Sequence, residues 1–139
     1  MKPDSSSGAQ RIGFLFNHDE LHQVAHIAPI ISALQRRAPG TSVEVITSSE
    51  RQADAVRTFL DPALPGPVFR SIRPHGGTRL VEKMLGNIVP LNRLSSLKRN
   101  ADLFRQFDAL VVPETTTTFL KKNGQMGRPK LIFFPHGAG

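Results

Sequence analysis

The stretch RIGFLFNHDELHQVAHIAPIISAL, residues 11–34, carries the pattern that decides the fold. Its first part, Arg11–Phe16, is a continuous apolar run of the kind found in parallel strands that are buried on both faces. A polar cluster of helix-capping residue types follows, in which Asn17 and Glu20 stand at the spacing of a capping box. Apolar residues then recur at helical spacing as far as Leu34. The stretch predicts a strand, a short loop and an amphipathic helix that is kinked at Pro29.

The same alternation of strand and helix continues along the chain. After residues 11–16, further strands are predicted at residues 42–48, 68–73, 109–113 and 130–134, with the one at 68–73 at a sheet edge. Helices are predicted after the first strand, after a cap at Ser49, and at residues 79–85, 91–107 and 115–122. This order predicts the α/β class: a Rossmann-like three-layer domain with a parallel sheet of about five strands. Residues 1–10 are expected to be a disordered polar lead-in, and residues 11–139 to form the domain.

Composition excludes several classes of protein. The chain has 139 residues, of which 39% are hydrophobic, a composition typical of a globular domain. Its longest apolar runs are far shorter than the roughly 20 residues that cross a bilayer. It contains no cysteine, which excludes disulfides and thiolate chemistry. The absence of Trp and Tyr argues against a stacking platform for single-stranded nucleic acid, and no specific nucleic-acid partner is expected.

Positive charge is concentrated in one segment. The net charge is +7, and residues 73–105 contain seven Lys or Arg against two acidic residues. The candidates for a basic surface are Arg79, Lys83, Arg93, Lys98 and Arg99. Such a segment is either a solvated helical face or a surface that meets an anionic lipid or a polyanionic acceptor.

Candidate site residues follow from the predicted sheet. Ligands of open α/β sheets bind beyond the carboxyl ends of the strands, which here selects residues 17–22, 48–50, 74–77, 114–118 and 136–139. His18, His75 and His136 fall within these segments. His136 can act as a general base, and Gly137 lets backbone approach a ligand closely; the alternative is a histidine in an ordinary turn.

Several ligand-binding patterns are missing or ambiguous. Neither a GxGxxG fingerprint nor a GxxxxGK[ST] loop is present, so no nucleotide cofactor is expected. The spacing of His18, His22 and His26 leaves open a metal chelate, a solvated or cleft-facing pair, and direct substrate contact, and no metal is predicted. The threonines at residues 115–118 could hold a phosphate at a helix N-terminus or could serve only as caps.

Two short patches resemble known enzymes of the GT-B architecture. Residues 22–34 (HQVAHIAPIISAL), with the pair Ala28-Pro29, resemble the first helix of the non-hydrolysing UDP-N-acetylglucosamine 2-epimerases. Residues 133–137 (FFPHG) resemble the strand and His-Gly motif in the N-terminal half of CDP-glycerol glycerophosphotransferases. That family more often continues with Thr-Pro, where this chain has Ala138 and Gly139.

The resemblance implies the acceptor-side half of a two-domain transferase. Such an enzyme moves glycerophosphate or a sugar from a nucleotide-linked donor, CDP-glycerol or a nucleotide sugar, to a hydroxyl acceptor in cell-envelope or polysaccharide synthesis. The donor would bind a C-terminal domain that this chain lacks, so the chain alone is expected to be inactive. His136 would be the catalytic base, and the cleft would be lined by His18, Asp19, His22, Glu114, Thr115 and Gly137. The basic surface would meet an anionic lipid or lipid-linked acceptor, in a cytoplasmic protein that is free or peripheral at the inner face of the membrane.

Two other functions remain as alternatives. A fragment of a 2-epimerase-like enzyme would act on a UDP-sugar with carboxylates and histidines and would need no external acceptor. A non-catalytic Rossmann-like binding module with a basic surface would have no exposed apolar face where a partner domain packs.

Overall fold

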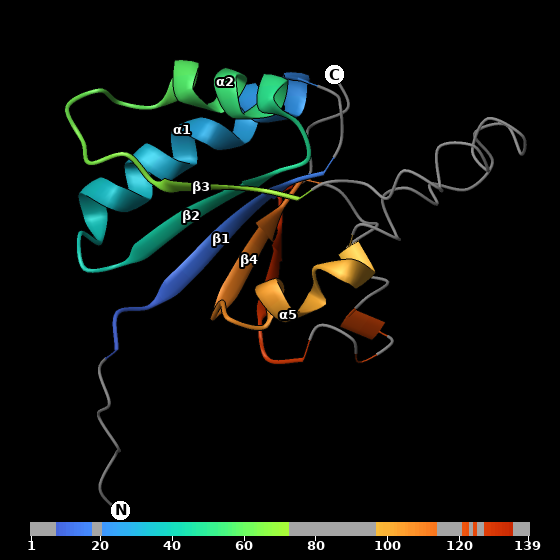
Figure 1. Cartoon of the computed structure of the whole chain (residues 1–139). Coiled ribbons are helices and arrows are strands. Elements are labelled where there is room, and N and C mark those ends of the chain that lie inside the picture. The colour runs from blue at the N-terminus through green and yellow to red at the C-terminus, as the bar shows by residue number, and fades with distance from the viewer. Residues whose placement is uncertain are drawn as a thin grey trace, which may run out of the picture.

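Five parallel strands form the centre of the structure, a computed structural model that describes residues 8–17, 21–72, 97–113, 121–122, 124 and 127–134 (Figure 1). The strand order is β3-β2-β1-β4-β5, and every neighbouring pair is parallel. The strands are β1 (Arg11–Phe16), β2 (Ser42–Thr47), β3 (Val68–Ser71), β4 (Ala109–Val112) and β5 (Lys130–Phe133). The predicted α/β class with a Rossmann-like parallel sheet is confirmed.

Helices lie on both faces of the sheet. Helix α1 (Leu21–Arg37) and helix α2 (Glu50–Phe59) cover one face, and the short α5 (Ala101–Phe104) lies on the other (Figure 1). α1 connects β1 to β2, and α2 connects β2 to β3, which are the crossovers that adjacent parallel strands require. The result is the three-layer arrangement expected for a sheet whose strands are apolar on both faces.

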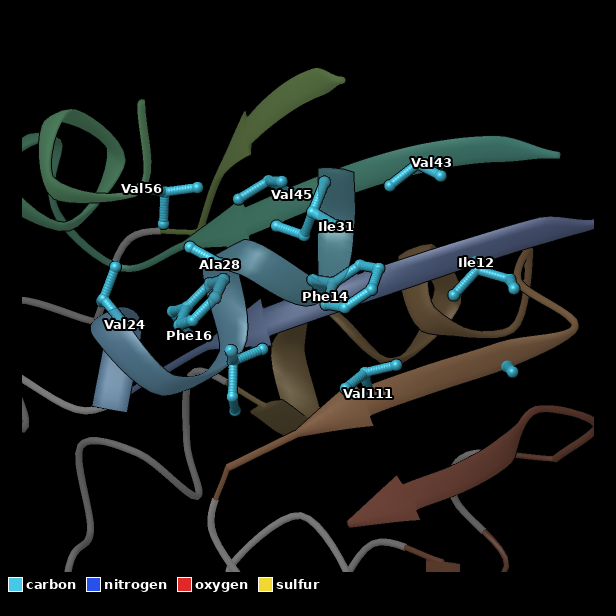
Figure 2. Close-up of a cluster of buried hydrophobic side chains, with 12 residues drawn as sticks. Ile12, Phe14, Phe16, Val24, Ala28, Ile31, Val43, Val45, Val56 and Val111 are labelled. Carbon is cyan, nitrogen blue, oxygen red and sulfur yellow. The ribbon is translucent and has the colours of Figure 1, made fainter. Parts of the chain in front are cut away.

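Two apolar clusters form the core, one on each face of the sheet. Under α1 and α2, Phe14 and Phe16 of β1 pack with Val24, Ala28 and Ile31 of α1 and with side chains of β2, β4 and α2 (Figure 2). The second cluster lies on the α5 face and consists of Leu15, Ile46, Ile72, Leu97, Phe104, Phe107, Leu110 and Val112. Odd and even positions of the same strands supply the two clusters, because successive side chains of a strand point to opposite faces.

Gly13 lets the second cluster pack directly on β1. A Cβ at this position would lie 2.7 Å from Leu110 Cδ2 and 3.2 Å from Phe107 Cδ1, which is closer than carbon atoms approach without displacement. The absence of a side chain therefore makes room on the α5 face for the leucine of β4 and the phenylalanine that precedes β4.

Most predicted elements are confirmed to within one or two residues. α1 is one helix of 17 residues with Pro29 inside it, and the kink stays a prediction. The predicted helix at residues 91–107 lies partly outside the described residues; its described part is helical at residues 97–99 and in α5, but it ends at Phe104. Two tight turns end it, with Gln106 N–H donating to Leu103 O and Phe107 N–H to Phe104 O, and they bring the Phe107 ring into the core.

Some predictions fall where the structure gives no description. The helix at residues 79–85, the lead-in at residues 1–7 and all but residues 121–122 of the helix at 115–122 lie outside the described residues. Among the helices that are described, none is long and apolar enough to cross a membrane.

Candidate functional site

The direction in which successive strands are added to the sheet reverses between β1 and β4. From β1 it adds β2 and β3 on one side, and it then crosses to the other side of β1 to add β4 and β5. Crossover connections on the two sides of such a point leave a crevice beyond the carboxyl ends of the two central strands, and ligands of open α/β sheets bind there. The candidate site is therefore the edge beyond β1 and β4, together with the neighbouring end of β2.

Backbone hydrogen bonds hold the residues that follow each strand in line with the sheet. Ser48 N–H donates to Phe16 O at 3.2 Å, and Ile72 N–H donates to Thr47 O at 2.8 Å. We call the carboxyl edge the residues that directly follow the five strands: Asn17, Ser48, Ile72, Pro113 and Phe134. Asn17 lies at its centre, because β1 is flanked by β2 and β4.

The Asn17 side chain is buried and incompletely bonded. Asn17 is 5% exposed, and its Nδ2 has no hydrogen-bond partner. It is the single buried side-chain nitrogen or oxygen without a partner in the described ranges. Ser32 and Gln52, also buried, are both bonded: Ser32 Oγ accepts from Asp61 N–H, and Gln52 Oε1 accepts from Ser48. An unmet buried donor costs about 1–3 kcal/mol, so its presence at the switch point needs an explanation.

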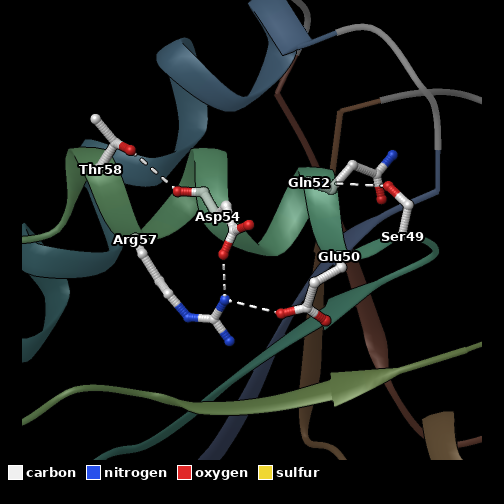
Figure 3. Close-up of polar contacts among 6 residues, drawn as sticks. All are labelled: Ser49, Glu50, Gln52, Asp54, Arg57 and Thr58. Atoms are coloured by element: carbon white, nitrogen blue, oxygen red, sulfur yellow. Dashed lines mark hydrogen bonds and ion pairs between the residues drawn. The ribbon is translucent and has the colours of Figure 1, made fainter.

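The end of β2 is rigidly built beside Asn17. Ser49 is the N-cap of α2, and its Oγ accepts from Gln52 N–H at 3.3 Å (Figure 3). Gln52 in turn accepts from Ser48, through its Oε1, at 2.9 Å from the backbone nitrogen and at 3.0 Å from Oγ. The predicted cap at Ser49 is confirmed. These bonds fix the turn between β2 and α2. The residues at the end of β2, beside Asn17, are therefore held in a defined position.

A second polar group of the sheet lies away from the carboxyl edge. Glu44 sits in the amino-terminal half of β2 on the α5 face, and its side chain is 5% exposed. Arg11 Nη2 donates to Glu44 Oε1 at 2.6 Å, and Arg70 Nε donates to Glu44 Oε2. Burial raises the pKa of Glu44, but the hydrogen bonds from the two arginines outweigh burial and hold this pKa below its ordinary value. This group joins β1, β2 and β3 and serves the fold.

Most of the predicted site residues lie outside the described residues. This holds for His18, Asp19, Glu114, Thr115, His136 and Gly137, and for the basic residues Arg79, Lys83 and Arg93. Of the others, His22 is exposed in the first turn of α1, and Lys98 and Arg99 are exposed at the helical residues 97–99. His22 and His26 both lie on the exposed side of α1, away from the buried Val24 and Ile27.

Asn17 is the candidate that the sequence pattern did not single out. It falls within the predicted segment 17–22, but its residue type and its spacing to Glu20 predict a cap at the start of the helix. Its position directly after the buried apolar residues 12–16 is the available signal, because a residue that follows a buried strand can stay buried for one more position. No group of three or more His, Cys, Asp or Glu that could hold a metal occurs among the described residues.

Comparisons with known proteins leave the site to be interpreted from its own geometry. No protein-family model, no curated protein and no solved structure matches this chain.

Proposed function

We propose that this chain is the acceptor-side domain of a GT-B transferase, which moves glycerophosphate or a sugar from a nucleotide-linked donor to a hydroxyl acceptor. The two sequence patches at residues 22–34 and 133–137 support this family, and the parallel sheet is compatible with it. The observation that carries the proposal is the buried Asn17 amide without a partner at the switch point of the sheet.

An asparagine amide nitrogen donates hydrogen bonds and cannot accept them, so the missing partner of Asn17 is an acceptor atom. Hydroxyl and phosphate oxygens of an acceptor substrate have this property. A nucleotide needs in addition a close approach of backbone to its pyrophosphate, for which the glycine-rich turn is absent after β1. The hydrogen-bond donor at the carboxyl edge, the Asn17 amide, therefore suits the acceptor substrate better than the nucleotide-linked donor substrate.

In the proposed reaction, His136 removes the proton of the acceptor hydroxyl. The oxygen then attacks the donor phosphorus, or the anomeric carbon if the donor is a nucleotide sugar. A new bond forms from the acceptor oxygen, and the bond from the nucleotide to the transferred group breaks, its electrons leaving with the nucleotide. Asn17 positions the acceptor by a hydrogen bond to one of its oxygens, and the basic residues, including Lys98 and Arg99, draw an anionic lipid or lipid-linked acceptor to the domain.

Calorimetric titration of the chain with sn-glycerol 3-phosphate, CDP and UDP-N-acetylglucosamine tests this proposal. We expect the glycerol phosphate to bind and the two nucleotides not to bind, with no turnover of CDP-glycerol by the chain alone. Loss of one hydrogen bond to a charged oxygen is worth about 1.5–3 kcal/mol, so Asn17→Leu should weaken binding at least tenfold.

The matched control is Thr58→Val, which removes the hydrogen bond from Thr58 Oγ1 to Asp54 O at the far end of α2. This variant should bind sn-glycerol 3-phosphate as tightly as the original chain does. Binding of UDP-N-acetylglucosamine at the carboxyl edge would instead favour the epimerase-like function. Failure of all three ligands to bind, in a folded chain, would overturn the proposal.

A further inference from the structure

The Gln52 side chain fixes the direction of the hydrogen bonds at the end of β2. Gln52 is 1% exposed in the first turn of α2, and its Oε1 lies 2.9 Å from the backbone nitrogen of Ser48 (Figure 3). A backbone N–H can only donate, so the Gln52 atom that it meets has to be the carbonyl oxygen. The backbone of Ser48 therefore sets which way the Gln52 amide is turned.

The single proton of the Ser48 hydroxyl is committed to the same oxygen. Ser48 Oγ lies 3.0 Å from Gln52 Oε1, and because an amide oxygen carries no proton, Ser48 Oγ is the donor of this bond. A hydroxyl has one proton and two lone pairs. Within the described residues no group donates to Ser48 Oγ, and Ser48 is half-buried. Ser48 therefore offers lone pairs, and no proton, at the carboxyl edge.

Asn17 and Ser48 are neighbours of opposite hydrogen-bonding character. β1 and β2 are in register up to Phe16 and Thr47, and Ser48 N–H then donates to Phe16 O at 3.2 Å, so Asn17 and Ser48 follow adjacent strand ends. Adjacent strands lie about 4.8 Å apart. Asn17 Nδ2 can only donate and has no partner, whereas Ser48 Oγ can only accept. One small ligand with an accepting oxygen and a donating group a few bonds apart can reach both residues.

We propose that Ser48 accepts a hydrogen bond from a second hydroxyl of the acceptor substrate, so that the domain selects polyol acceptors. This inference rests on the proposed function, in which the reacting hydroxyl gives its proton to His136 and Asn17 donates to another oxygen of the acceptor. A hydroxyl that has lost its proton cannot donate to Ser48, so the hydroxyl that Ser48 holds is not the reacting one.

A phosphate oxygen fits Ser48 less well than a hydroxyl does. It could bond to Ser48 Oγ only if the Ser48 proton left Gln52, which exchanges one hydrogen bond for another. sn-Glycerol 3-phosphate meets all the requirements of the edge: a phosphate oxygen accepts from Asn17, the 2-hydroxyl donates to Ser48, and the 1-hydroxyl is left to react. The substrate class is therefore an acceptor with at least two free hydroxyl groups.

Calorimetric titration with sn-glycerol 3-phosphate and with 3-hydroxypropyl phosphate, which lacks the 2-hydroxyl, tests this inference. The original chain should bind 3-hydroxypropyl phosphate about tenfold more weakly, because one hydrogen bond is lost. Ser48→Ala should weaken the binding of sn-glycerol 3-phosphate by about the same factor and leave the binding of 3-hydroxypropyl phosphate unchanged. The dissociation constants of the two ligands should then be about equal, as a thermodynamic cycle requires when both changes remove the same bond.

The matched control is Thr58→Val at the far end of α2, which should keep the difference between the two ligands. Equal binding of the two ligands by the original chain, or a difference that survives Ser48→Ala, would overturn the role of Ser48 and leave the proposed function standing. Failure of sn-glycerol 3-phosphate to bind would overturn both. The comparison of the two ligands on the original chain needs no substitution, so it decides the matter even if Ser48→Ala does not fold.

Discussion

Replacing Glu44 by glutamine removes a buried negative charge that Arg11 and Arg70 share across three strands. Removing one partner of a fully buried pair costs about 3–5 kcal/mol, because the remaining charge is left uncompensated. The arginine side chains are 34% and 44% exposed, so water can solvate them in part and the cost is smaller. Glutamine also keeps one acceptor oxygen. We expect a loss of about 2 kcal/mol in the free energy of unfolding at pH 7, within the range for a broken network.

The pH dependence of this loss has a definite sign. The pKa of Glu44 is lower in the folded chain than its ordinary value near 4.5. A carboxyl group with a lowered folded pKa stabilises the protein above its ordinary pKa, and this stabilisation disappears as the pH falls through the folded pKa. The difference between the original chain and Glu44→Gln should therefore be constant above about pH 5.5 and shrink below about pH 4.5.

Urea unfolding, followed by far-UV circular dichroism at pH 7 and in acid, measures this effect. With a slope of about 1–3 kcal/mol/M, a loss of about 2 kcal/mol lowers the midpoint by about 1 M urea. The matched control is Asp102→Asn, which removes the exposed pair of Asp102 with Arg105 and should cost less than about 0.5 kcal/mol. Equal effects of the two substitutions at pH 7, or a difference for Glu44→Gln that grows as the pH falls, would refute this reasoning.

Three other substitutions give separate expectations. Gly13→Ala should lower the free energy of unfolding in urea by about 1–3 kcal/mol, because the new Cβ would clash with Leu110. The control is Gly40→Ala, whose Cβ would have no atom within 4 Å and which should change this free energy by less than about 1 kcal/mol. Ser49→Ala removes the α2 cap and should cost about 1 kcal/mol in the same assay; no change would mean that the cap is dispensable. Lys98→Glu should reduce cosedimentation of the chain with phosphatidylglycerol vesicles and leave the low binding to phosphatidylcholine vesicles unchanged. Equal binding of the original and substituted chains to phosphatidylglycerol vesicles would count against a basic lipid-contact surface.

The strands and the long helices could be predicted because local pattern determines them. Residues 12–16 of β1 are apolar throughout, and the strand is bounded by the polar residues Gln10 and Asn17, so its ends match the prediction. Ser49 with Gln52 formed a recognisable cap, and the short, weakly apolar segment at residues 68–73 was correctly placed at a sheet edge. In each case the information lies within a few residues of the element itself.

The chemistry of the sheet could not be predicted in the same way. Glu44 alternates with apolar residues in β2, a pattern that normally places a charge in water; it is buried because Arg70, 26 positions away, lies on the neighbouring strand. The burial of Asn17 likewise depends on elements that are distant in sequence, while its residue type suggests a cap.

The central claim is that Asn17 holds an oxygen of the acceptor at the switch point of the sheet. Two-dimensional ¹⁵N NMR of the chain, titrated with sn-glycerol 3-phosphate, reads the Asn17 side-chain amide directly. We predict that the two Nδ2 protons shift to higher frequency on binding, together with the backbone amide of Ser48 on the neighbouring strand end, whereas the amide of Thr58 stays unchanged. Saturable binding that leaves the Asn17 side-chain amide unmoved would contradict the account.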